Sequence, residues 1–141
     1  MISMRAFFDI NVLVDVLVRR AGWRSSLALI QKVRNGEIEG YVSALTVAII
    51  YFLRARSLPE VESKEITKGI VRGFRIVSLT EDVVTRALDE ERIKDFEDAI
   101  QFHSAKEAAE VFITRNKRAF MAVKDEIEIL TSEEFLKKYG P

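Results

Sequence analysis

Three aspartates have the spacing and placement that metal-dependent chemistry requires. Asp95 and Asp98 are three residues apart, so a helix would carry both on one face, and Asp9 directly follows a short apolar run. Two carboxylates held close together repel each other unless a cation lies between them, and Mg²⁺ and Mn²⁺ prefer oxygen ligands. Asp is also favoured at the cap and in the first turn of a helix, so each group taken alone fits a structural role better.

A second set of polar residues could contact the phosphate backbone of a nucleic acid. The segment 114–118 combines three cations with two short polar side chains, a composition that suits phosphate binding. The simpler interpretation of this segment is a charged turn, and that of Asn11 is a helix cap. The candidates for substrate binding are Asn11, Ser43, Thr114, Arg115, Asn116 and Lys117.

Several other chemistries lack the residues that they need. The chain has no cysteine, which excludes a disulfide framework, a thiolate nucleophile and a cysteine-based zinc site. A serine hydrolase is disfavoured because no G-x-S-x-G motif occurs and the single histidine, His103, falls inside an expected helix as a packed or surface residue. A phosphatase of the haloacid dehalogenase type needs a second aspartate two residues after Asp9, where this chain has Asn11.

Alternating strands and helices must position these side chains. Short apolar, β-prone runs predict strands at 5–8, 40–43, 75–78, 111–114 and 127–130. Apolar residues at helical spacing predict helices from Val12, across 27–35, 46–56, 57–73 and 95–106, and after Thr80 and Thr131. This alternation predicts a three-layer α/β/α domain with a central parallel sheet of about five strands. The working site of such a sheet lies at the carboxyl ends of its strands, which selects Asp9, Ser43, Ser78 and Thr114.

Some of these helices carry a more specific signal. Ser57 with Glu60 and Thr131 with Glu134 have the spacing of capping boxes, and Pro59 suits a first helical turn. The 46–56 run predicts a buried helix, although its short apolar core would also fit a strand. Residues 47–53 include more apolar side chains than one helix face needs, so some could line a subunit contact or a groove. Complete burial of this helix fits the sequence equally well.

Composition limits the class of protein. A chain of 141 residues that is 48% hydrophobic fits one folded domain over 1–141. Its net charge is zero, so any contact with RNA or DNA must come from a local patch. The sequence lacks a secretion signal, and its longest apolar stretch, 41–53, is too short to span a bilayer, so we expect a cytoplasmic protein without a membrane partner. Few Asn and Gln beside 31% charged residues are typical of heat-adapted proteins.

Three segments together resemble the PIN-domain family, which includes the VapC-type toxins of prokaryotic toxin–antitoxin pairs. The segment 7–15 resembles the family's opening strand with its D-x-N-V-L pattern, 95–101 resembles its central D-A motif, and 111–116 is similar to its late T-R-N segment. The resemblance spans nearly the whole chain, and the order, spacing and strand-end placement of the motifs carry it.

The resemblance implies a parallel sheet with helices on both faces and cleavage of RNA at acidic residues that hold Mg²⁺ or Mn²⁺. Asp9 and Asp98 occupy two of the family's acidic positions, with Asp95 beside them, so these three are the expected metal ligands and catalytic residues. Thr114 and Asn116 would position water or phosphate. Arg115, Lys117 and Arg118 would guide the RNA. VapC-type proteins commonly dimerise and bind an antitoxin helix, so a homodimer and an antitoxin partner are also expected.

Two positions depart from the family pattern. Ile49 stands where the family usually has a glutamate, six residues after Ser43, and Ala119 stands where the late motif usually has an acid. A site with fewer carboxylates should hold a hard dication more weakly. The sequence therefore leaves open two interpretations: a ribonuclease with weakened activity, and a degenerate member that binds RNA or a protein without cutting. A structural subunit bound to a partner is a third interpretation.

Overall fold

A parallel sheet of five strands forms the centre of the chain, which we describe from a computed structural model of residues 4–140. The strands lie in the order β3-β2-β1-β4-β5, and each neighbouring pair is parallel. Their bounds are β1 Arg5–Phe8, β2 Glu39–Ser43, β3 Arg75–Val77, β4 Val111–Ile113 and β5 Glu128–Leu130. All five predicted strands are confirmed, each within one residue at either end.

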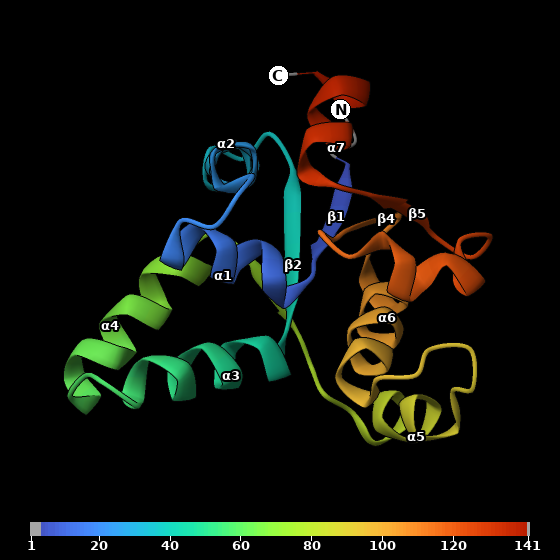
Figure 1. Cartoon of the computed structure of the whole chain (residues 1–141), viewed down its shortest axis with the longest axis horizontal. Coiled ribbons are helices and arrows are strands. Elements are labelled where there is room, and N and C mark those ends of the chain that lie inside the picture. Colours follow the sequence, from blue (N-terminus) through green and yellow to red (C-terminus); the bar gives the residue numbers. More distant parts are fainter. Residues whose placement is uncertain (1–3, 141) are drawn as a thin grey trace.

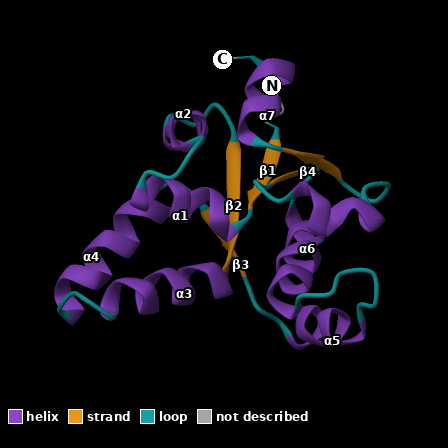
Figure 2. Ribbon diagram, in the orientation of Figure 1, coloured by secondary structure: helices purple, strands orange, loops and turns teal. Residues whose placement is uncertain are grey.

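Helices cover both faces of this sheet (Figure 1). The helices are α1 Ile10–Val18, α2 Trp23–Arg34, α3 Ala44–Ala55, α4 Glu60–Val71, α5 Glu81–Asp89, α6 Phe96–Ala108 and α7 Ser132–Tyr139, with a 3₁₀ helix, η1, at Lys117–Val123. Figure 2 shows the strands between one group of helices that includes α1 to α4 and another that includes α5 and α6. The predicted three-layer α/β/α architecture is therefore confirmed.

Two apolar cores follow from the alternation of side chains along the strands. In β1, Ala6 and Phe8 belong to the core beneath α1 to α4, whereas Phe7 belongs to the core beneath α5 and α6. All three side chains are fully buried, as expected of a central strand covered on both faces. A register shift of one residue would exchange the two sets, so this packing fixes where β1 ends and where Asp9 lies.

The helix boundaries confirm some sequence signals and correct one. Thr131 and Glu134 form the predicted capping box, and Thr80 caps α5 by accepting the Val83 N–H at 3.1 Å. The box predicted at Ser57 is wrong, because α4 begins at Glu60 with Pro59 as its N-cap. Ser57 instead lies in the turn that ends α3, where its N–H donates to the Arg54 carbonyl at 3.1 Å.

Helix α3 is the predicted buried helix, but only part of it is buried. Thr46 and Ile50 point into the protein, while Phe52 is 64% exposed. It begins two residues earlier than predicted because the Ser43 hydroxyl accepts the N–H groups of Leu45 and Thr46. Within residues 4–140, neither α3 nor any other helix has the length and apolar character that a membrane crossing requires.

Candidate active site

Asp9 lies at the carboxyl end of β1 with its two carboxylate oxygens in different surroundings. Its backbone N–H donates to the Ile113 carbonyl at 2.9 Å, which ties it to the end of β4. Its Oδ2 accepts a hydrogen bond from the Thr114 hydroxyl at 2.8 Å, whereas Oδ1 is buried without a hydrogen-bond partner among the described residues. Asp9 holds the N-cap position of α1, yet its side chain makes no capping hydrogen bond. The helix-cap interpretation therefore does not account for this carboxylate.

Burial and neighbouring carboxylates disfavour negative charge on Asp9. Desolvation raises the pKa of Asp9 from 3.8 to about 7, although the Thr114 hydrogen bond opposes the rise. Asp98 and Glu97, at the start of α6, raise this pKa further, and α6 packs against β1. A buried carboxylate with a free oxygen and acidic neighbours is suited to a cation.

The start of α6 supplies the other acidic groups. Asp98 is half-buried, and its pKa is raised to about 6, first by desolvation and then by Asp95 and Glu97. Asp95 is exposed and is the N-cap of α6, where its Oδ1 accepts the Asp98 N–H at 2.9 Å. The structural role weighed for Asp95 is thus real, and one of its oxygens is already engaged.

Glu97 is a residue of this site that the sequence analysis did not select. It is partly buried, and its pKa is raised by desolvation and then by Asp95. The signal in the sequence was its place between the two selected aspartates, but the i, i+3 spacing drew attention to those alone. It adds a second carboxylate, beside that of Asp98, to the surroundings of Asp9.

The donor atoms fit a hard divalent cation that keeps part of its water shell. Asp9 offers a buried oxygen that has no hydrogen-bond partner among residues 4–140, and Asp98 offers a carboxyl group whose pKa is raised by burial. In the part of the chain that the structure describes, no three acidic or histidine side chains gather closely enough to enclose a metal by themselves. Mg²⁺ is commonly bound by one or two carboxylates together with waters, so a pair of aspartates is a sufficient protein contribution.

A cavity of about 340 Å³ opens beside Asp98. Asp95, Lys94, Arg118 and Ala119 also line it. Ala119, where the resemblance expects an acid, therefore lines the same cavity as Asp98. Ile49 is partly buried against the core that contains Phe8 and Ile10, the two residues on either side of Asp9 in the chain.

Several predicted substrate-binding residues have partners within the protein. Thr114 is fully buried and orients Asp9, while its Oγ1 also accepts the Asn116 N–H at 3.1 Å. The Arg115 guanidinium pairs with Asp15 at 3.0 Å, and the Lys117 ammonium donates to Glu134 at 3.0 Å. These contacts offset the charge of two of the three cations in the segment 114–118.

The other selected residues are spread around the same edge of the sheet. Asn11 is partly buried in the first turn of α1, and Asn116 is exposed after β4. Ser43 is fully buried and caps α3, so its position gives no support to the role expected for it in RNA binding. His103 is packed inside the protein, which is one of the two placements predicted for it. Its Nε2 lies 3.0 Å from a Glu90 carboxylate oxygen.

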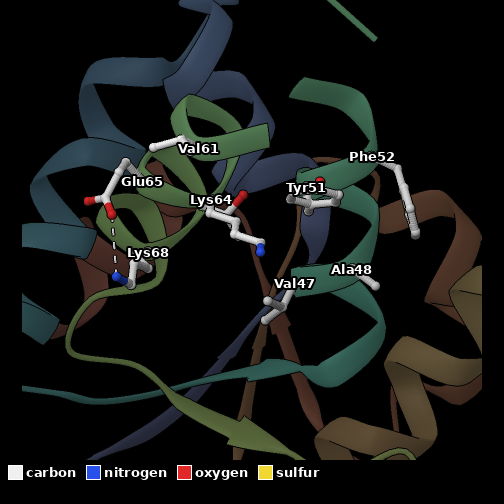
Figure 3. Close-up of a pocket in the computed structure, with 9 residues that line it drawn as sticks. Val47, Ala48, Tyr51, Phe52, Val61, Lys64, Glu65 and Lys68 are labelled. Carbon is white, nitrogen blue, oxygen red and sulfur yellow. Dashed lines mark hydrogen bonds and ion pairs between the residues drawn. The ribbon is translucent and has the colours of Figure 1, made fainter. Parts of the chain in front are cut away.

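A second cavity lies away from the acidic residues, between α3 and α4. Its volume is about 490 Å³, and most of its lining is apolar, including Val47, Tyr51, Phe52 and Val61. Figure 3 shows Lys64 reaching from α4 into the space beside Tyr51 and Val47. The apolar residues of 47–53 thus divide between the core, which takes Ile50, and this groove.

The fold and the site define a class, a three-layer α/β/α protein with acidic residues at the carboxyl edge of a parallel sheet. A family model described as PIN domain matches residues 5–118, and the chain belongs to the PIN-domain family.

Particular relatives agree with this assignment. The chain is similar to Ribonuclease VapC1 of Aquifex aeolicus (strain VF5), with 25% identity over 143 residues that cover 98% of this chain and 97% of the relative. Among solved structures, a toxin–antitoxin complex from Klebsiella pneumoniae has a chain with a TM-score of 0.65 and 22% identity, covering 90% of this chain and 97% of that one. A chain of VapBC2 from Rickettsia felis, bound to a DNA fragment from their promoter, has a TM-score of 0.64 and 12% identity over 90% and 97% of the two chains. At these identities the solved structures support the fold.

Proposed function

We propose that this chain is a metal-dependent ribonuclease of the VapC toxin type, formed by residues 1–141 as one PIN-like domain. The observation that carries the proposal is the buried, unpartnered Oδ1 of Asp9 close to the raised-pKa carboxyl of Asp98, in a member of the PIN-domain family. The similarity to Ribonuclease VapC1 supports RNA as the substrate. An enzyme acting on RNA would work in the cytoplasm.

Asp9 and Asp98 would hold the cation, Mg²⁺ or Mn²⁺, and Asp95 would assist through its free carboxylate oxygen, directly or through water. A bound cation would lower the pKa of a water and stabilise the charge that develops during phosphodiester hydrolysis. The Thr114 hydroxyl keeps Oδ2 of Asp9 occupied and so leaves Oδ1 as the oxygen that would contact the cation. Lys94 and Arg118 line the cavity beside Asp98, where they would attract the phosphate of the substrate.

A degenerate protein that binds RNA or a partner without cutting is the second candidate. Ile49 and Ala119 favour it, because each places an apolar side chain where the resemblance expects an acid. The two candidates share the same surface and differ only in whether the remaining carboxylates hold a cation tightly enough for hydrolysis.

We also propose an antitoxin as the protein partner, with an apolar helix in the groove between α3 and α4. Phe52 and Val61 are 64% and 73% exposed there, an arrangement that suits the apolar face of an incoming helix. The solved relatives include toxin–antitoxin complexes, which supports the class of partner. Co-expression with the product of a neighbouring small open reading frame tests this, since Phe52→Glu should abolish co-purification and Glu62→Lys on the exposed part of α4 should not.

Cleavage of a labelled single-stranded RNA tests the ribonuclease proposal. We expect cleavage by the native chain with Mn²⁺ or Mg²⁺, no cleavage with EDTA, and a loss of roughly ten-fold or more in Asp98→Asn. Asp89→Asn, at an exposed position on α5, is the matched control and should retain full activity. Cleavage unaffected by Asp98→Asn would contradict the site, and a folded native chain that binds RNA without cutting it would favour the degenerate protein.

A further inference from the structure

An aromatic ring lies close to two arginines where the chain passes from α1 to α2. The Trp23 ring lies 5.3 Å from the guanidinium carbon of Arg19 and 5.0 Å from that of Arg24. With Arg20 they line an open cavity of about 300 Å³. The three arginines are exposed, and Trp23 is partly exposed. We call Arg19, Arg20, Trp23 and Arg24 the Arg–Trp cluster.

The positive charge of this cluster is only partly offset. Among residues 4–140, neither Arg19 nor Arg24 belongs to an ion pair. Arg20 lies 3.8 Å from Asp15, but that carboxylate is shared with Arg115, which approaches it more closely at 3.0 Å. In a chain of zero net charge, this turn is therefore a local cationic patch of the kind that nucleic-acid binding requires.

A series of contacts connects the cluster to the candidate active site. Thr114 holds Asp9, the next residue, Arg115, pairs with Asp15 on α1, and Asp15 in turn faces Arg20. The start of α2, which carries Trp23 and Arg24, is also fixed to the start of α7, because the hydroxyls of Ser26 and Ser132 share a buried hydrogen bond of 2.9 Å. Since α1 has nine residues, the cluster lies about 13 Å further along the helix from Asp9, within reach of a short nucleic-acid strand.

We infer that the Arg–Trp cluster binds single-stranded RNA next to the cleavage site, with a base stacked on Trp23 and phosphates held by the arginines. This inference rests on the proposed ribonuclease function, since that function makes RNA the ligand. Aromatic rings stack on any unpaired base, and a guanidinium displaced from the ring would be free to bind phosphate. Arg19 and Arg24, which belong to no ion pair among residues 4–140, favour a polyanion over an apolar protein segment, for which the groove between α3 and α4 is better suited.

Trp23 is the only tryptophan of the chain, so its fluorescence reports on this one position. Titrating Asp98→Asn protein with short oligouridine and oligoadenine should give a saturable change in Trp23 fluorescence that weakens with added salt. The inactive background keeps the RNA intact and separates binding from cleavage. RNA binding seen by anisotropy without any change in Trp23 fluorescence would overturn the inference.

Two sets of variants test the roles within the cluster. Trp23→Ala should weaken RNA binding roughly ten-fold, and Trp23→Phe should retain most of it because a ring remains. Replacing both Arg19 and Arg24 with Ala should make the plot of log affinity against log salt shallower by about 1.4. The charge-matched control, Arg72→Ala with Arg75→Ala, changes exposed arginines near the amino end of β3 and should leave that slope unchanged. Equal effects of both pairs would overturn the inference.

The outcomes for the cluster and for the ribonuclease are separate. Suppose that Trp23→Ala cleaves RNA as fast as the native protein, and that RNA leaves the Trp23 fluorescence of Asp98→Asn protein unchanged. These results would overturn RNA binding by the cluster and leave the ribonuclease proposal intact. A Trp23 response to RNA in a protein that cuts no RNA with any divalent metal would support the cluster and refute the ribonuclease. A response to a protein partner but not to RNA would overturn the inference and identify the turn as a protein contact.

Discussion

The two oxygens of Asp9 show how much of a site depends on single contacts. Asp9, Asp98 and Asp95 could be selected from residue type, spacing and position after a strand. The different roles of the two Asp9 oxygens could not be predicted in this way, because they depend on burial and on Thr114, which is distant in the sequence. The partners of Arg115 and Lys117, which are Asp15 and Glu134, also lie outside the segment 114–118. Sequence patterns therefore overestimated the free positive charge after β4 and missed Glu97.

Asp9→Asn should stabilise the protein above neutral pH when no divalent metal is present. The pKa of Asp9 is about 7 in the folded protein and near 3.8 when unfolded, so the folded state holds the proton more tightly. Its contribution to stability is complete below pH 3.8 and is lost as the pH rises through 7. The variant should therefore gain up to about 4 kcal/mol at pH 8 and nothing near pH 3.5.

Urea unfolding in EDTA at several pH values measures this difference. Asp89→Asn provides the control, because its carboxylate is exposed and its replacement should leave the free energy of unfolding unchanged. An Asp9→Asn variant that is less stable than the native chain at pH 8 would contradict this prediction. It would mean that contacts absent from this structure stabilise the ionised Asp9 carboxylate.

The elements were predicted more completely than the site, because apolar periodicity reports directly on which face is buried. The positions of β1 and β4 were the plainest, because all of their apolar side chains are buried. The box predicted at Ser57 failed because Pro59 fixes an extended backbone immediately before α4. The η1 helix at Lys117–Val123 had no periodic signal of its own, and the charged segment before it suggested only a turn. Strand order came from tertiary pairing, which no local pattern contains.

Restoring acids at Ile49 and Ala119 should strengthen the metal site. Ala119 lines the cavity beside Asp98, so Asp at this position could add a carboxylate there. We expect the double change Ile49→Glu, Ala119→Asp to raise metal affinity and metal-dependent RNA cleavage by roughly ten-fold or more. The two changes should couple, because both serve one centre.

The matched control for this gain is Ile49→Gln with Ala119→Asn, which has the same shapes without the charges. Cleavage rates of both double variants at several Mn²⁺ concentrations separate a charge effect from a packing effect. A folded acidic double variant that cleaves RNA no faster than the amide pair would contradict one of two claims. Either Ile49 and Ala119 do not occupy the family's acidic positions, or the chain is not a ribonuclease.

At the scale of the whole molecule, charge is balanced overall and uneven locally. Equal numbers of acidic and basic residues remove most long-range repulsion between copies, which favours association. The exposed apolar residues of α3 and α4 add a surface that could take part in it. Sequence composition predicted the need for a local patch to bind RNA, while the Arg–Trp cluster became visible only in the folded chain.

We predict that the chain alone forms a homodimer at micromolar concentration. Light scattering should give a mass near twice the 16.1 kDa of one chain. Added salt should change this mass little, because apolar contact rather than ion pairing would hold the copies together. A mass near that of one chain, independent of concentration, would leave the dimer without support.

The most direct test of the account is whether Mn²⁺ binds to the pair Asp9 and Asp98. Calorimetric titration of the native chain at pH 8 should show weak binding to one site, lost in Asp98→Asn and kept in Asp89→Asn. Binding should weaken below pH 7, because protons then compete for Asp9, whose pKa is about 7. Tight Mn²⁺ binding that survives Asp98→Asn would contradict the assignment of the site.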